Sequence, residues 1–359
     1  MDIKTDYNSN NYTIHVGHSI FETYINYYTS KYNDVFYLID EYVFDLYKEK
    51  FISFENVIKV PQGESFKDIH HVMDTIDLLL KNEVKRNSLI VVIGGGATGD
   101  AGAFLSSILL RGIDYIHVPT TLLSHDSSIG GKTAINRPSG KNLVGTFYRP
   151  KGVIYDLNFL QTLNSEELLS GFGEVVKHAM LNNKNTINHL TEVTKNGINL
   201  KELEPFIISG IKTKMYYVTV DETESNLRRS LNLGHTLGHA LEYEYKLKHG
   251  HAIILGLLFM LFLSNKILDS QFDLNYYKKY FKKIGYNISY LYNLAEDNLI
   301  DLMSIDKKNS VSNMINFVLL EDYGTPVFKG IEKNALKDYL KEFQEIIWQM
   351  KLKRLLKEH

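Results

Sequence analysis

The sequence contains no cysteine among its 359 residues. This absence excludes a disulfide framework, a cysteine nucleophile and any metal site built on thiolates. A metal site in this chain must therefore use His, Asp and Glu side chains.

An excess of charge and a membrane-length apolar run are also missing. The net charge is -2, from 40 basic and 42 acidic residues, and such a balance does not indicate a nucleic-acid partner. The longest apolar stretch, residues 252–263, is too short to span a bilayer, so we expect a buried helix there. The opening residues MDIKTDYNSNNY have no apolar h-region. We therefore expect no signal peptide, no membrane partner and a cytoplasmic location.

The chain is long enough for two domains, and its 44% apolar content can build a large core. Short apolar runs alternate with helix-like segments in the first half, which is typical of βαβ units and a mostly parallel sheet. We predict strands at these residues: 35–40, 56–60, 89–96, 115–119 and 152–157.

The second half is mainly helical in its periodicity, with one apolar run at 313–320 that predicts a late strand or extended segment. Asn164, with Glu167 three residues later, resembles a capping box at a helix start. We therefore predict a Rossmann-like α/β domain over residues 1–164 and a mainly helical domain over residues 165–359.

A glycine-rich turn, GGGATGD at 94–100, follows a predicted strand and precedes a predicted helix. Glycines allow a pyrophosphate to approach the backbone, and a helix N-terminus offers unpaired N–H groups. Asp114 falls near the place of a ribose-binding acid, although a turn position is expected for it, and Asp40 ends a strand at the same edge. A lone glycine motif also occurs for purely steric reasons, so this turn alone leaves dinucleotide binding open.

Histidines gather in LNLGHTLGHALE and in the KHGHA that follows it. His235 and His239 are four residues apart and share a helix face, and His249 and His251 follow. Glu174 lies on an earlier predicted helix. Cysteine-free zinc sites combine His with carboxylate, and spacing alone favours the His235–His239 pair. Capping and packing remain the alternative roles for these side chains.

Polar, glycine-rich loops carry Asp126, Lys132, Lys141 and Asn142, and such loops are suited to an anionic ligand. Lys177 lies one helical turn after Glu174. Lys214, Arg228 and Asn232 precede the histidine motif. Together these side chains indicate a substrate with more than one negative group, such as a phosphate and a carboxylate.

The ordered set of motifs resembles the 3-dehydroquinate synthase family. The segments that carry this resemblance are GESFK (63–67), GGGATGD (94–100), RGIDYIHVPTTLL (111–123), DSSIGGK (126–132), GKNLVGTFYRP (140–150), SGFGEVVKHA (170–179), LNLGHTLGHALE (231–242), HGHA (249–252) and DKKN (306–309). The resemblance covers residues 35 to 320.

The resemblance implies a role for each matching position. The metal ligands would be Glu174, His235 and His249, holding zinc or cobalt, and this replaces the His235–His239 pairing. The cofactor NAD would meet Asp40, Glu64, Lys67, Gly96, Ala97, Thr98, Gly99, Asp100, Thr120, Thr121, Lys132, Lys141, Phe159 and Thr162. The substrate and its protons would be handled by Asp126, Lys132, Asn142, Lys177, Lys214, Arg228, Asn232, His239 and a lysine of DKKN, for which Lys307 is favoured and Lys308 stays open. Arg111 would reach the neighbouring subunit's site in a homodimer.

The family's reaction, in the shikimate pathway, converts 3-deoxy-arabino-heptulosonate 7-phosphate to 3-dehydroquinate and phosphate. It is a carbon–oxygen lyase reaction in which NAD is reduced and reoxidised within one turnover. Three alternatives remain at this stage: another sugar phosphate cyclase, a metal-dependent alcohol or glycerol dehydrogenase, and a non-catalytic NAD-binding relative.

Overall fold

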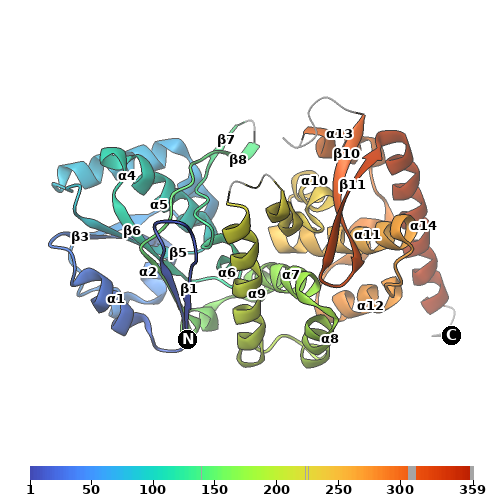
Figure 1. The fold of residues 1–359 in the computed structure, drawn as a ribbon, viewed down its shortest axis with the longest axis horizontal. Coiled ribbons are helices and arrows are strands. Elements are labelled where there is room, and N and C mark those ends of the chain that lie inside the picture. Colours follow the sequence, from blue (N-terminus) through green and yellow to red (C-terminus); the bar gives the residue numbers. More distant parts are fainter. Residues whose placement is uncertain (139, 223, 225, 306–312, 356–359) are drawn as a thin grey trace. The chain divides into compact units, whose positions relative to one another are not determined.

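The computed structural model describes the whole chain except residues 139, 223, 225, 306–312 and 356–359 (Figure 1). The chain forms two compact units, one of residues 1–168 and 214–219 and one of residues 169–213 and 220–359. The domain boundary at residue 164 stays a prediction.

The first unit is built on a seven-stranded sheet with the order β1-β2-β9-β6-β5-β3-β4. Only β1 runs antiparallel to its neighbour, and every other pairing is parallel. The strands are β1 (Asp2–Lys4), β2 (Thr13–Gly17), β3 (Val35–Asp40), β4 (Val57–Val60), β5 (Leu89–Gly94), β6 (Asp114–Pro119) and β9 (Gly152–Asp156). The predicted parallel sheet is confirmed, and β1 and β2 are additions that the sequence pattern missed.

Both faces of this sheet are buried because alternate side chains of each strand enter different cores. In β3, Phe36 and Leu38 belong to one core cluster, and Tyr37 and Ile39 belong to the other. The first cluster also takes side chains from α4 (Ile69–Lys81) and α5 (Gly96–Ile108). The second takes them from α1 (Phe21–Thr29), α2 (Glu41–Leu46) and α3 (Lys48–Phe51).

Short elements complete the first unit, most of them beyond the carboxyl ends of the strands, with η2 before the amino end of β6. They are η1 (Gly63–Lys67), η2 (Leu109–Arg111), α6 (Ser124–Ser127), the hairpin β7 (Ile135–Arg137) and β8 (Gly140–Val144), and η3 (Leu157–Thr162). The sequence pattern did not predict the β7–β8 hairpin, because its strands are short and polar.

The second unit is mainly helical, as predicted. Its elements are α7 (Ser165–Asn182), α8 (Lys184–Val193), α9 (Leu200–Val220, whose residues 214–219 lie in the first unit), η4 (Leu227–Asn232), α10 (His235–Tyr245), α11 (His249–Leu268), α12 (Leu274–Ile284), η5 (Ile288–Tyr292), α13 (Glu296–Ile305) and α14 (Lys333–Leu355). Asn164 accepts a hydrogen bond from Glu167 N–H at 2.8 Å, so the predicted cap of α7 is formed.

The predicted buried helix is α11. Within the described residues it alone is long and apolar enough to cross a membrane, yet 72% of its apolar window is buried inside the fold. The late strand predicted at 313–320 is β10 (Met314–Asp322), and it pairs with β11 (Thr325–Glu332), which was not predicted. Gly324 connects the two strands with a left-handed backbone, φ 81°.

Candidate active site

The glycine-rich turn lies between β5 and α5, and its glycines are required by close contacts. A Cβ on Gly94 would lie 2.7 Å from the Thr98 side chain, and one on Gly102 would lie 2.6 Å from Val92. The turn thus packs α5 tightly on the sheet. The first N–H groups of α5, which have no partner within the helix, and the positive end of its dipole lie at the carboxyl edge of β5.

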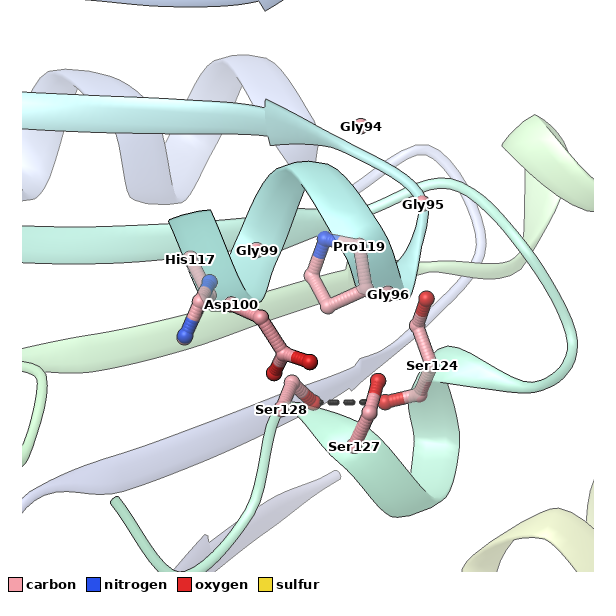
Figure 2. A pocket seen from close by; sticks show the side chains of 10 residues that line it. All are labelled: Gly94, Gly95, Gly96, Gly99, Asp100, His117, Pro119, Ser124, Ser127 and Ser128. Atoms are coloured by element: carbon pink, nitrogen blue, oxygen red, sulfur yellow. Dashed lines mark hydrogen bonds between the residues drawn. The ribbon is translucent and has the colours of Figure 1, made fainter. Parts of the chain in front are cut away.

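A polar pocket opens beside this turn (Figure 2). Its walls come from α5, β6 and α6, all within the first unit. The lining residues are Gly94, Gly95, Gly96, Gly99, Asp100, His117, Pro119, Ser124, Ser127 and Ser128. The Asp100 carboxylate is paired with the buried Lys67, Nζ to Oδ2 2.7 Å, and Lys67 also donates to Asn142.

Asp40 ties three segments of this edge together. Its carboxylate accepts hydrogen bonds from Tyr42 N–H, Gly63 N–H and the Thr98 hydroxyl, at 3.0, 3.1 and 3.1 Å. The structure therefore brings the end of β3, the start of η1 and the first turn of α5 to one place. Thr120 adds a buried hydroxyl that has no hydrogen-bond partner among the described residues.

The other predicted cofactor contacts differ in their burial and in their hydrogen-bond partners. Glu64 accepts from Asn136 at 2.6 Å, and the Thr162 hydroxyl lies 2.9 Å from Tyr47. Phe159 is packed in the core between Phe21 and Phe51. Of the remaining positions, Ala97 lies in α5 and Thr121 follows β6. Lys132 lies just before the β7–β8 hairpin, and Lys141 lies in β8.

Asp114 corrects one expectation. It begins β6 rather than lying in a turn, and it stands at the amino end of that strand, opposite the glycine turn. There it accepts from the Tyr32 hydroxyl at 2.9 Å and pairs with Lys151 at 3.2 Å. Ligands of parallel sheets bind at the carboxyl ends of the strands, so Asp114 is not placed to bind a ribose.

In the second unit, glycines bring three helices close together. A Cβ on Gly250 would lie 1.7 Å from the carbonyl oxygen of Ser170, so α11 touches α7 backbone to backbone. A Cβ on Gly256 would lie 1.9 Å from the carbonyl oxygen of Gly234, so α11 also touches the start of α10. Each crossing stands next to one of the predicted metal ligands.

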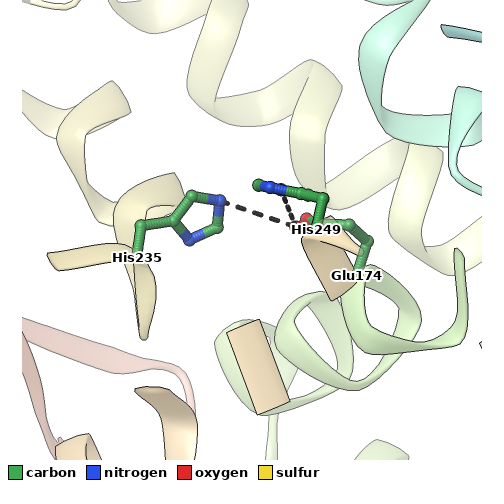
Figure 3. Close-up of side chains that lie close together, drawn as sticks. All are labelled: Glu174, His235 and His249. Carbon is green, nitrogen blue, oxygen red and sulfur yellow. Dashed lines mark hydrogen bonds and ion pairs between the residues drawn. The ribbon is translucent and has the colours of Figure 1, made fainter. Parts of the chain in front are cut away.

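Those ligands, Glu174 on α7, His235 at the start of α10 and His249 at the start of α11, converge on one point (Figure 3). Glu174 Oε1 lies 3.5 Å from His235 Nε2 and 3.2 Å from His249 Nε2. Ligands 2.0–2.1 Å from a tetrahedral ion stand about 3.4 Å apart. The spacing of the three donor atoms therefore fits a metal ion of that size.

Each histidine has an acceptor beside Nδ1, so that with a metal bound its Nε2 would serve as the ligand. His235 Nδ1 donates to the carbonyl oxygen of Leu233 at 2.9 Å, and His249 Nδ1 donates to Glu242 at 2.9 Å. An acceptor on Nδ1 holds the proton there and directs the lone pair of Nε2 towards the metal position.

The surroundings of the two histidines shift their pKa values in opposite directions. Burial lowers the pKa of His235 well below its usual range, which keeps that ring neutral. Burial opposes the charged form of His249 as well, but its hydrogen bonds to Glu174 and Glu242 outweigh this effect and raise its pKa. A proton on His249 thus balances part of the charge of the two carboxylates, and a bound metal ion would take its place.

Lys177 and His239 flank this cluster. Lys177 is 1% exposed and forms an ion pair with Glu174 from one turn along α7. His239 is exposed, one turn after His235, and its ring centroid is 5.8 Å from that of His249. His239, Glu242 and His249 also form a second group of close potential ligands.

The predicted anion-binding side chains fall in both units. In the first unit Lys214 pairs with Asp126 at 3.1 Å, and Lys132, Lys141 and Asn142 are exposed. In the second, Arg228 is 2% exposed and donates to the carbonyl oxygen of Glu222. Lys307 and Lys308 lie outside the described residues.

Two site residues were missed by the sequence reasoning, Glu242 and His117. Glu242 is seven residues after His235, so the i, i+4, i+7 spacing with His239 places all three on one helix face and could have revealed it. His117 gives no such pattern, because a single histidine in a buried strand resembles any core residue.

Family comparisons agree with this arrangement. The family model for the 3-dehydroquinate synthase N-terminal region matches residues 57–170, and that for the C-terminal region matches residues 171–309. The chain belongs to the 3-dehydroquinate synthase family. A 3-dehydroquinate synthase of Staphylococcus haemolyticus is 45% identical over 355 residues, which are 97% of this chain and 100% of that protein. One of Staphylococcus aureus is 42% identical over 345 residues, which are 94% and 97% of the two chains.

Several solved enzyme structures share the fold. A 2-deoxy-scyllo-inosose synthase, complexed with carbaglucose-6-phosphate, NAD+ and Co2+, has a TM-score of 0.83 at 23% identity, over 95% of this chain and 99% of that one. The 2-epi-5-epi-valiolone synthase of Streptomyces hygroscopicus, with NAD+ and Zn2+ bound, has a TM-score of 0.81 at 19% identity and the same coverage. An iron-containing alcohol dehydrogenase of Thermotoga maritima has a lower score, 0.65 at 15% identity, over 95% and 99% of the chains.

Proposed function

We propose that this chain is a 3-dehydroquinate synthase that converts 3-deoxy-arabino-heptulosonate 7-phosphate to 3-dehydroquinate and phosphate, using NAD and one divalent metal ion. The observation that carries the proposal is the convergence of Glu174, His235 and His249, with Nε2 of both rings directed at one carboxylate. Family membership supplies the reaction, and this ligand set supplies the chemistry that the reaction requires.

The metal ion would be held by these three side chains. Two neutral nitrogens and one carboxylate are a common ligand set of catalytic zinc, with a coordination position left for substrate. Zinc and cobalt both accept this set. When bound, the ion supplies a Lewis acid that lowers the pKa of a substrate hydroxyl, and NAD+ supplies a hydride acceptor for the same carbon.

The cofactor would lie on the glycine turn. The unpaired N–H groups at the start of α5 suit a pyrophosphate. The buried hydroxyl of Thr120, which has no partner among the described residues, and the pocket beside Asp100 support a ligand at this edge.

The remaining side chains would orient the substrate and move its protons. Lys177 holds a buried positive charge beside Glu174, where it can bind an anionic substrate oxygen. His239 is exposed on the same helix face as His235, so it can exchange protons between substrate and water. Arg228, anchored through its guanidinium, suits a carboxylate. The phosphate would meet the lysines of the first unit and one lysine of DKKN, Lys307.

A homodimer is part of the proposal, with Arg111 reaching the site of the partner copy. Arg111 is exposed, and both Leu110 and Arg111 have left-handed backbones, with φ of 50° and 68°. A left-handed backbone conformation is strained for a residue with a bulky side chain, and here two such residues follow one another. Strain of this kind persists where the surrounding structure or the function requires it. A cytoplasmic location accords with a cofactor and a substrate of central metabolism.

The deciding experiment measures phosphate release from zinc-loaded protein with 3-deoxy-arabino-heptulosonate 7-phosphate, with and without NAD, while NADH absorbance is followed. We expect release that requires NAD and accumulates no NADH, because the hydride returns within one turnover. Accumulation of NADH in step with product would instead indicate a dehydrogenase. Absence of release, together with turnover of a neutral sugar phosphate, would indicate another cyclase.

The metal assignment has its own test. Glu174→Ala and His235→Ala should each lose stoichiometric metal and turnover, while Glu244→Ala, a half-buried position on the same α10 that accepts from Asn298, should lose neither. Full activity of a metal-depleted Glu174→Ala protein would overturn the site.

A further inference from the structure

His117 is a buried histidine beside the glycine turn that no step above uses. It lies on β6, and its ring is directly beneath the first turn of α5: a Cβ on Gly99 would lie 3.1 Å from His117 Cε1 and 3.3 Å from Nδ1. The residue is 6% exposed, and it lines the pocket together with Asp100 (Figure 2). The absence of a side chain on Gly99 is what leaves room for this ring.

The imidazole of His117 lacks polar partners within the protein. Among the residues that the structure describes, neither ring nitrogen has a hydrogen-bond partner, and its ring contact is the edge of Tyr115 at 5.1 Å. Burial lowers its pKa to about 4, so the ring is neutral at physiological pH. A neutral imidazole offers one N–H donor and one nitrogen acceptor. A buried pair of this kind normally has partners in a ligand or an ordered water.

The pocket around His117 is better suited to an amide than to a phosphate. A phosphate there would face the Asp100 carboxylate, whereas the N–H groups at the start of α5 offer it donors and a positive dipole end. Two of the serine hydroxyls already have partners: Ser124 lies 2.7 Å from the Thr121 hydroxyl, and Ser128 donates to the carbonyl oxygen of Ser124. A carboxamide, which both donates and accepts, matches the neutral ring of His117.

We propose that His117 hydrogen-bonds, directly or through one water, to the carboxamide of NAD where the nicotinamide end of the cofactor enters this pocket. The proposal rests on the proposed function in one respect, that NAD is the cofactor. It adds a binding residue for one end of that cofactor and distinguishes this end from the pyrophosphate on the turn.

The test compares two ligands on the zinc-loaded full chain by calorimetry: NAD+ and ADP-ribose, which lacks the nicotinamide. For His117→Ala we expect the Kd of NAD+ to rise about tenfold, as for the loss of one hydrogen bond in a buried site, and the Kd of ADP-ribose to stay within about twofold. His117→Gln, which keeps a donor and an acceptor, should retain most of the affinity for NAD+. His70→Ala, an exposed change in the same unit, should alter neither Kd.

A second measurement uses wild-type protein first, so it does not depend on how a variant folds. The analogue 3-acetylpyridine adenine dinucleotide lacks the amide NH2, and wild-type protein should therefore bind it more weakly than NAD+. In His117→Ala, the loss of affinity should then be smaller for the analogue than for NAD+.

Equal losses of NAD+ and ADP-ribose affinity in His117→Ala would show that His117 only supports the turn, and an unchanged Kd of NAD+ would show that it binds no cofactor group. Either result overturns the proposal. If wild-type protein binds neither NAD+ nor ADP-ribose, the assignment of the cofactor fails first.

Discussion

Substitution of Gly250 by alanine should move His249 on α11 away from Glu174 on α7 and so disrupt the metal site. Gly250 follows His249 at the start of α11 and faces the backbone of α7 at Ser170, one helical turn before Glu174. The added Cβ would lie 1.7 Å from the carbonyl oxygen of Ser170 and 2.6 Å from its carbonyl carbon. Both are backbone atoms, so no side-chain rotation can relieve the clash.

The size of the effect follows from the distances. Ordinary contact begins at 3.4 Å and the Cβ would start at 1.7 Å, so α7 and α11 must move apart by about 1.7 Å. If His249 moves with its helix, the 3.2 Å between its Nε2 and Glu174 Oε1 grows to about 4.9 Å. An ion with ligand distances of 2.0–2.1 Å spans at most about 4.2 Å, so it can no longer bind both atoms. We also expect overpacking to lower the free energy of unfolding by about 1–3 kcal/mol.

The assay is a titration of apo protein with Co2+ against a competing chelator, followed by the visible absorption of the bound ion. Gly250→Ala should bind at least about 100-fold more weakly than wild type, and its spectrum should change because one protein ligand is lost. Lys266→Ala, at the exposed end of the same helix, should leave the affinity unchanged, since it removes only a surface ion pair with Glu342. An affinity of Gly250→Ala within threefold of wild type would refute the view that this crossing positions the ligands.

Three further outcomes are expected. Glu242→Ala should weaken metal binding about 10- to 100-fold in the same titration, because His249 loses the acceptor that fixes its tautomer; Glu242→Gln should recover part of the loss, and equal affinities in all three proteins would contradict this role. Arg228→Ala should raise KM and lower kcat in the phosphate-release assay with Co2+ affinity retained, and an unchanged kcat/KM would remove Arg228 from the site. Burial lowers the pKa of His117 from 6.5 in the unfolded chain to about 4 in the fold, so its contribution to stability is fully present above pH 6.5 and is lost as the pH falls through 4. In chemical denaturation, the free energy of unfolding of wild type should therefore fall by about 3 kcal/mol more than that of His117→Gln between pH 7 and pH 4. Equal losses in the two proteins would contradict burial of a neutral ring.

The fold was largely predictable from the sequence because its buried elements are long and periodic. The strand at 35–40 alternates between two cores, and both faces of the sheet are covered, which gives the continuous apolar runs that predict a parallel sheet. The elements that were missed lie at the margins. The antiparallel β1, the polar β7–β8 hairpin and the exposed β11 bury too little apolar surface to produce a recognisable period.

The site was less predictable from the residues themselves, because its geometry is set by contacts between distant segments. Spacing along one helix favoured His235 with His239, and only the family resemblance pointed to Glu174 and His249. Nothing in the local pattern shows that Gly250 and Gly256 bring α11 against two other helices, since that contact depends on how three helices cross.

The crossings explain why spacing along α10 gives an incomplete answer. His235 and His239 share a helix face, and their rings are 5.1 Å apart, but Glu174 Oε1 is paired with His235 and with His249 from another helix. A metal ion bound by side chains from α7, α10 and α11 links three helices to one another. An i, i+4 pair of ligands would involve one helix alone. His239 is exposed, which suits a residue that exchanges protons with water. The ligand set therefore depends on the glycine contacts that bring α11 against α7 and α10, which spacing along α10 alone does not reveal.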